Sequence, residues 1–173
     1  MNNFREKLSE IKAFIFDIDG VLSLQTINLN VSGVPARTVN LRDGYALQLA
    51  VRKGYRVAVI SGSSSKDYLK RLKLFGICDI YLKSSDKTVS YEAFVKKYNL
   101  KSEEVLYMGD DIPDFEVMKR CGIAVCPADA DSEIKQISAY ISDKRGGEGC
   151  ARDIIEQVLR LHNDWLNSDA FTW

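Results

Sequence analysis

The sequence predicts an α/β fold, a three-layer, Rossmann-like parallel sheet with helices on both faces, built as a single domain over residues 1–173. Short apolar runs alternate with longer amphipathic segments along the chain, which is typical of β–α units. Gly54, Gly76 and Gly122 each end a helical stretch directly before an apolar run. Such a glycine commonly ends a helix, so three of these junctions favour repeated crossovers between parallel strands.

Five apolar segments are predicted as buried strands because they are short and bounded by turn residues; they are residues 11–16, 55–60, 79–82, 105–108 and 123–125. Helices are predicted where apolar residues recur at three- and four-residue spacing. The clearest cases lie in 88–99 and near the C-terminus, at Tyr91, Phe94, Val95 and Tyr98 and at Ile154, Val158 and Leu161.

Residues 23–42 break this alternation because they show no helical period. Two extended stretches flank the turn-like run 32–35, which contains Gly33 and Pro35. This pattern predicts a β-hairpin inserted just after the first strand. The last residues, 170–173, are expected to be loosely held, as chain ends often are.

The charge balance and the number of cysteines and histidines restrict the classes of partner and metal site that the chain can have. Lys plus Arg and Asp plus Glu both number 24, so we expect neither a nucleic acid nor an anionic membrane as the main partner. The chain has four cysteines without a C-x-x-C pair and one histidine, His162, too few ligands for a zinc site. We therefore expect reduced thiols, a surface position for His162 and a cytoplasmic protein. The polar N-terminus does not resemble a signal peptide.

Asp17 and Asp19 follow the first predicted strand and precede Gly20. Side chains alternate along an extended segment, so both carboxylates are expected to point the same way, at the strand end where parallel sheets place ligands. Asp-Gly is also a common turn dipeptide. A pair of solvated turn aspartates is therefore the simpler alternative, although the apolar strand leading into them favours a functional pair.

A second acidic group, Asp110, Asp111 and Asp114, follows the predicted strand 105–108. Asp111 could be a helix N-cap ahead of Pro113, but capping accounts for only one of the three aspartates. If both acidic groups meet at one edge of the sheet, their oxygens would form a site for a hard cation such as Mg²⁺.

Two further predicted strand ends carry polar residues. Ser61 and Gly62 follow the second strand and could cradle an anion at a helix N-terminus, although an ordinary helix cap is the simpler interpretation. Lys87 follows the third strand. It could neutralise a phosphate, or it could be one more solvated lysine.

In this order, Asp17/Asp19, Ser61, Lys87 and Asp110/Asp111/Asp114 resemble the four motifs of the haloacid dehalogenase superfamily of phosphotransferases. The resemblance implies that Asp17 is a nucleophile that becomes phosphorylated and that Asp19 is the general acid and base. It further implies a Mg²⁺ ion held by the Asp17 carboxylate, the Asp19 backbone carbonyl and Asp110.

The same resemblance implies that Ser61 and Lys87 bind the phosphoryl oxygens. Asp111 and Asp114 would lie behind the metal ligands and orient them together with Lys87. Mg²⁺ and Lys87 would then let an anionic carboxylate approach an anionic phosphate.

The stretches between the motifs leave no room for a cap domain. The resemblance therefore narrows to the capless 3-deoxy-D-manno-octulosonate 8-phosphate phosphatases, supported by residues 39–45 and 145–152. It implies a small phosphorylated sugar acid as substrate, a role in lipopolysaccharide biosynthesis, and a homotetramer joined through the hairpins. The substrate contacts it implies are Leu41, Arg42, Asp43, Gly44, Tyr45, Gly62, Ser63, Arg71 and Arg152. Arg152 could equally form a surface ion pair.

The chain departs from the family pattern at Leu82-Lys83, where Gln-Gly is usual, and at Ser61, where Thr is common. Ser63 replaces the Glu of relatives that act on nine-carbon sugar acids, which favours the eight-carbon substrate. The alternatives are a nine-carbon keto-deoxy sugar acid phosphatase and a non-catalytic oligomerisation module of the same fold. A phospho-accepting signalling domain is disfavoured by Asp19.

Overall fold

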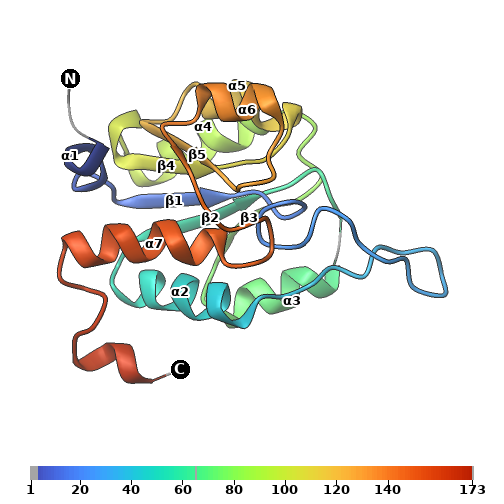
Figure 1. Cartoon of the computed structure of the whole chain (residues 1–173), viewed down its shortest axis with the longest axis horizontal. Coiled ribbons are helices and arrows are strands. Elements are labelled where there is room, and N and C mark those ends of the chain that lie inside the picture. Colours follow the sequence, from blue (N-terminus) through green and yellow to red (C-terminus); the bar gives the residue numbers. More distant parts are fainter. Residues whose placement is uncertain (1–3, 65, 173) are drawn as a thin grey trace.

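Six parallel strands form one sheet in the order β3-β2-β1-β4-β5-β6 (Figure 1). This computed structural model describes residues 4–64 and 66–172. The strands are β1 Ala13–Phe16, β2 Arg56–Ile60, β3 Asp79–Tyr81, β4 Val105–Met108, β5 Ile123–Cys126 and β6 Tyr140–Ile141. The predicted parallel α/β fold is therefore confirmed. The predicted strands lie within two residues of the observed ones, whereas β6 was missed because two residues are too few to show a period.

Helices cover both faces of the sheet (Figure 1). They are α1 Phe4–Leu8, α2 Leu41–Arg52, α3 Lys66–Leu74, α4 Lys87–Tyr98, α5 Phe115–Met118, α6 Ser132–Ile137 and α7 Cys150–Leu161, with short 3₁₀ turns η1 Ser102–Glu104, η2 Ile112–Asp114 and η3 Ser168–Phe171. Alternate residues of β1 face opposite layers. Phe14 and Phe16 pack with α2, α3 and α7, whereas Ala13 and Ile15 pack with α4, α5 and α6.

The order of the strands creates a switch point between β1 and β4. From β1 the chain builds outward through β2 and β3, and then returns to place β4 on the other side of β1. Phe16, the last residue of β1, pairs with Val59 of β2 and with Met108 of β4. In open α/β sheets, ligands bind outside the carboxyl ends of strands at such a point.

The predicted hairpin does not form regular strands. The segment 24–40 folds back on itself and extends away from the body of the molecule (Figure 1). The hydrogen bonds from Asn30 N to Val34 O and from Ala36 N to Asn28 O, both 2.8 Å, hold its two arms around one bridge between Leu29 and Pro35. An isolated two-stranded ribbon is marginal in water, and a proline cannot donate to a ladder.

Two smaller expectations, on the C-terminal tail and on Gly122, are corrected. The tail is held rather than loose, since Ala170 is buried and the Arg52 side chain donates to Thr172 O at 2.9 Å; Trp173 lies outside the described residues. His162 is only partly buried, as expected for a residue near the surface, and it contacts the Tyr55 hydroxyl and Ser9 O. Gly122 was expected to end a helix. Its position instead requires glycine because the chain packs closely there, and a Cβ would lie 2.5 Å from the Cα of Glu103.

Between the strands of the described chain, no folded cap domain is inserted; the β1–β2 connection adds only the 24–40 extension and α2. None of the helices in residues 4–64 and 66–172 combines the length and apolarity needed to cross a bilayer. All four cysteines carry free thiols.

Candidate active site

The two acidic motifs meet at the switch point of the sheet. Asp17 directly follows β1 and Asp110 lies two residues beyond β4. The backbone N–H of Asp17 donates to Met108 O at 3.1 Å, which extends the β1–β4 pairing past the strand ends. The parallel register thus brings together residues that lie more than ninety positions apart in the chain.

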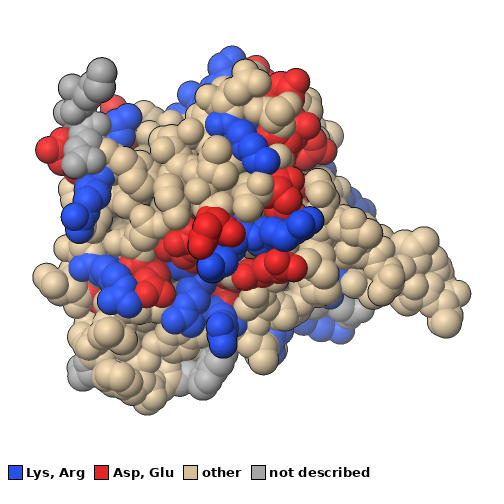
Figure 2. Space-filling view, in the orientation of Figure 1, with Lys and Arg blue, Asp and Glu red and all other residues tan. Residues whose placement is uncertain are grey.

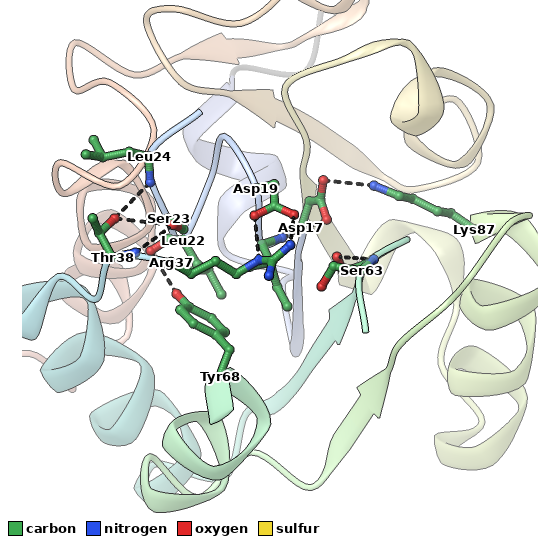
Figure 3. A network of polar contacts seen from close by, with 12 residues as sticks. Asp17, Asp19, Leu22, Ser23, Leu24, Arg37, Thr38, Ser63, Tyr68 and Lys87 are labelled. Carbon is green, nitrogen blue, oxygen red and sulfur yellow. Dashed lines mark hydrogen bonds and ion pairs between the residues drawn. The ribbon is translucent and has the colours of Figure 1, made fainter. Parts of the chain in front are cut away.

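Three carboxylates form the centre of the site. Oxygens of Asp17, Asp110 and Asp114 all lie within 4.8 Å of one another, and the residues are only 7%, 4% and 1% exposed. Lys87 is the cation beside them, with Nζ 2.9 Å from Asp17 Oδ2 and 2.7 Å from Asp114 Oδ1 (Figure 3 shows the Asp17 contact). Tyr107 donates its hydroxyl to the same Asp114 oxygen at 2.7 Å.

This crowding shifts the acidity of the buried groups. Burial and the neighbouring Asp114 raise the pKa of Asp17 to about 7, although Lys87 and the Ile18 backbone N–H work in the opposite direction. Burial, Asp17 and Asp114 raise the pKa of Asp110 to about 8. Burial by itself lowers the pKa of Lys87, but Asp114 and Asp17 outweigh it, so that the pKa is raised overall. The site therefore needs more positive charge than Lys87 supplies.

The donor set fits a magnesium ion. Carboxylate oxygens are the ligands that Mg²⁺ prefers, and three carboxylates converge here with Lys87 as counter-charge. Asp114 Oδ2 is buried and lacks a hydrogen-bond partner among the described residues, which is costly unless a further ligand satisfies it. Asp114 lies within the carboxylate cluster and contacts Lys87, and its role in orienting the metal ligands and Lys87 stays a prediction.

Two glycines create the space for these carboxylates. A Cβ at Gly20 would lie 1.9 Å from Asp110 Oδ2, and its φ of +85° is one that side chains rarely adopt. A Cβ at Gly109 would lie 2.5 Å from the Cβ of Asp114. Gly20 therefore lets Asp110 approach from the other strand end, and Gly109 lets Asp114 approach from the turn that follows it.

Asp19 and Asp111 lie apart from the three-carboxylate cluster. β1 ends before Asp17, so strand alternation does not fix the direction of Asp19; its two oxygens accept hydrogen bonds from Arg37, each at 2.7 Å (Figure 3). Asp111 is exposed and accepts from the Ile112 N–H at 2.8 Å, at the start of η2. Asp111 is therefore an N-cap, which is the alternative that the sequence offered for this residue.

Ser61 continues β2 toward the same edge of the sheet. Its backbone N–H donates to Tyr81 O at 2.9 Å, and its hydroxyl accepts from the Ser63 N–H at 3.1 Å. The hydroxyl proton of Ser61 stays available to an anion, because that contact uses the oxygen only as an acceptor. Ser63 Oγ is buried and unpaired among the described residues. Gly62 is exposed.

Several predicted substrate contacts have partners inside the fold. Asp43 is buried and accepts from the Arg152 backbone N–H at 2.7 Å. Gly44 makes room for the ring of Phe75, which a Cβ would meet at 2.4 Å. Tyr45 donates to Ala170 O. Leu41 and Arg42, at the start of α2, are exposed.

The two remaining predicted contacts are arginines on helices. Arg71 lies over the ring of Phe75. Arg152 pairs with Glu156 at 3.3 Å and stacks on Trp165, so the surface ion pair weighed from the sequence is present. Figure 2 shows acidic and basic side chains mixed across this side of the molecule. Contact of these residues with substrate stays a prediction.

Two polar residues of the site went unrecognised in the sequence. Tyr107 lies in β4 among apolar neighbours, and a hydroxyl inside a buried strand is a signal that could have identified it. Arg37 lies in the irregular segment 24–40, and nothing in the local sequence indicates that it reaches Asp19.

Known proteins are similar to this chain in both sequence and fold. The model of the haloacid dehalogenase-like hydrolase family matches residues 72–154. The 3-deoxy-D-manno-octulosonate 8-phosphate phosphatase of Salmonella typhi is 32% identical over 153 residues, which cover 88% of this chain and 81% of the relative.

Solved structures extend the likeness over almost the whole chain. A 3-deoxy-D-manno-octulosonate 8-phosphate phosphatase from Moraxella catarrhalis, in complex with magnesium, phosphate and KDO, has a TM-score of 0.90 at 32% identity and covers 99% of this chain and 97% of its own. A cobalt-bound relative from Haemophilus influenzae has a TM-score of 0.89 at 26% identity, with coverage of 95% and 98%.

Together with the buried carboxylates, the magnesium-bound relative makes Mg²⁺ the cofactor of this site. The likeness to the phosphatases extends over most of both chains and is supported by the shared fold. The chain therefore belongs to the haloacid dehalogenase-like hydrolase family and is a phosphoric monoester hydrolase.

Proposed function

We propose that the chain hydrolyses 3-deoxy-D-manno-octulosonate 8-phosphate to the free sugar acid and phosphate, through an aspartyl-phosphate on Asp17. The observation that carries this proposal is the placement of Asp17, next to Lys87 and within 4.8 Å of the Asp110 and Asp114 carboxylates. The names of the relatives in Salmonella typhi and Moraxella catarrhalis support the choice of substrate.

In the first step, an Asp17 carboxylate oxygen bonds to phosphorus while the bond from phosphorus to the sugar oxygen breaks. Asp19 gives its proton to the departing oxygen. Asp17 Oδ1 accepts from the Ile18 N–H at 2.7 Å and Oδ2 contacts Lys87, so the nucleophile is held in one orientation. Mg²⁺, when bound by Asp17, the Asp19 backbone carbonyl and Asp110, supplies positive charge that offsets the phosphoryl oxygens.

In the second step, water attacks phosphorus and gives a proton to Asp19. The bond between phosphorus and Asp17 breaks, which releases phosphate and restores the carboxylate. Lys87 and the Ser61 hydroxyl bind the phosphoryl oxygens throughout. Asp114 and Tyr107 keep Lys87 in place, since Asp114 Oδ1 accepts from both.

Asp17→Asn tests this mechanism because an amide has the same shape and cannot serve as the nucleophile. We expect kcat for phosphate release to fall by about a thousandfold or more, with the fold retained by circular dichroism. Asp143→Asn, an exposed aspartate paired with Lys144, is the matched control and should keep its activity. Wild-type turnover by Asp17→Asn, or full activity with excess chelator, would refute the mechanism.

The substrate is tested with a panel of eight- and nine-carbon sugar-acid phosphates, assayed with and without Mg²⁺. A higher kcat/KM for the eight-carbon compound supports the proposal, and a preference for the nine-carbon compound would contradict it.

The product is a sugar acid used in lipopolysaccharide biosynthesis, and the free thiols suit a cytoplasmic setting. We also propose a homotetramer, supported by the exposed Leu29, Val31 and Val34 of the 24–40 segment and measurable by light scattering.

A further inference from the structure

Arg37 makes the most specific contact near the site that the proposed mechanism does not use. Its Nε donates to Asp19 Oδ1 and its Nη2 to Asp19 Oδ2, each at 2.7 Å (Figure 3). A guanidinium that binds both oxygens of a carboxylate fixes its position and its rotation together. The Arg37 side chain is 9% exposed, whereas that of Asp19 is 38% exposed. Arg37 therefore holds Asp19 and leaves it accessible.

The backbone beside Arg37 is itself fastened to the loop after β1. The Thr38 N–H donates to Ser23 Oγ and the Leu24 N–H donates to Thr38 Oγ1, both at 3.0 Å. Ser23 is completely buried, so this clamp between Ser23 and Thr38 lies against the core (Figure 3). The clamp fixes the start of the Arg37 side chain, and the ion pair fixes its end.

We propose that Arg37 is a positioning residue that holds the Asp19 carboxylate where it exchanges protons with substrate and water. This inference rests on the proposed function, because it gives Asp19 the role of general acid and base. Each Asp19 oxygen keeps a lone-pair position that Arg37 does not occupy, so one of them can carry the proton that Asp19 gives to the leaving oxygen and takes back from water. The irregular segment 24–40 thereby contributes directly to the geometry of the site.

The proposal is tested by a double-mutant cycle, with Arg37→Ala and Asp19→Asn made singly and together. Because Arg37 acts through Asp19, we expect Arg37→Ala alone to lower kcat by about tenfold to a hundredfold while KM changes less than about threefold. In the Asp19→Asn background the same change should alter kcat less than about twofold. Lysine keeps the charge without the two-point contact, so Arg37→Lys should restore part of the activity.

A second variant and a matched control separate positioning from folding. Thr38→Val removes the hydroxyl of the clamp and should lower kcat in the same way but less. Arg120→Ala removes an arginine from a surface ion pair with Glu92 and should leave kcat unchanged. Thermal melting and Mg²⁺ titration should show that the Arg37 variants fold and bind metal as the wild type does.

Equal losses from Arg37→Ala in both backgrounds would overturn the proposal, as would wild-type kcat in Arg37→Ala. A raised KM with unchanged kcat would instead mean that Arg37 binds the substrate directly, and this result would also overturn the proposal. If Asp19→Asn turns over too slowly to assay, the division of the Arg37→Ala effect between kcat and KM decides. Activity retained by Asp17→Asn would refute the proposed function itself, whatever Arg37 does.

Discussion

At the scale of single residues, the site depends on close approach between two loops that the sequence keeps far apart. Gly20 follows β1, and the carboxylate of Asp110 occupies the space where its side chain would be. The Asp-x-Asp-Gly pattern thus serves two purposes in the proposed site, since its aspartates are the proposed catalytic groups and its glycine admits the Asp110 carboxylate from the loop after β4.

Gly20→Ala should therefore weaken Mg²⁺ binding by about tenfold to a hundredfold, because the new methyl group displaces Asp110. Isothermal titration of the metal-free protein with Mg²⁺ measures this. Gly54→Ala is the matched control, since Gly54 has a similar φ of +89° but nothing within 4 Å of its Cβ. Both variants should lose about 1 kcal/mol of stability from backbone strain, but only Gly20→Ala should lose metal affinity.

At the scale of secondary-structure elements, α2 and α7 are joined by a buried carboxylate. Helix α7 begins after Gly149, which has no side chain to cap it. Asp43 of α2 reaches across and accepts from the Arg152 backbone N–H. Burial raises the pKa of Asp43 to about 6, although the N–H groups of Arg152 and Gly149 oppose the shift. One helix thus supplies the N-terminal cap of the other.

Asp43→Ala should lower the free energy of unfolding by about 1 to 2 kcal/mol, as loss of a helix cap does, and leave KM nearly unchanged. Urea denaturation and steady-state kinetics measure the two effects. Asp43→Asn keeps an acceptor oxygen and should lose less stability. If Asp43→Ala were as stable as the wild type but had a raised KM, the substrate contact predicted from the sequence would be the better account of this residue.

At the scale of the whole molecule, the active site opposes the stability of the metal-free fold. Asp17 and Asp110 have ordinary pKa values near 3.8 when unfolded, but about 7 and about 8 in the folded chain. The folded state therefore holds protons that the unfolded state releases, and stability is lost as the pH rises toward 8. Mg²⁺ binds the folded state and offsets this loss.

In chelator, we expect the melting temperature to fall by on the order of 5 °C between pH 6 and pH 8. Added Mg²⁺ should raise the melting temperature more at pH 8 than at pH 6. Scanning calorimetry measures both, and Asp110→Asn should flatten the dependence because it removes one of the two titrating groups. A melting temperature of the metal-free protein that rises with pH would contradict the shifts assigned to Asp17 and Asp110.

The sequence alone determined the parallel α/β fold, because burial on both faces of a sheet leaves short apolar runs separated by amphipathic helices. It also placed Asp17 and Asp110 just beyond strand ends and Lys87 after the third strand, and the parallel topology then brings them to one edge. These features are local patterns combined with a general rule for open sheets.

Only the tertiary structure decided the rest. Arg37 meets Asp19, Asp114 joins the carboxylate cluster and Asp43 caps α7 through contacts between segments whose side-chain directions no local period fixes. The 24–40 segment has the turn of a hairpin but pairs with no strand of the sheet among the described residues, so its two extended stretches did not become regular strands. Local pattern fixes which elements form, whereas packing between distant elements fixes where each polar side chain finds its partner.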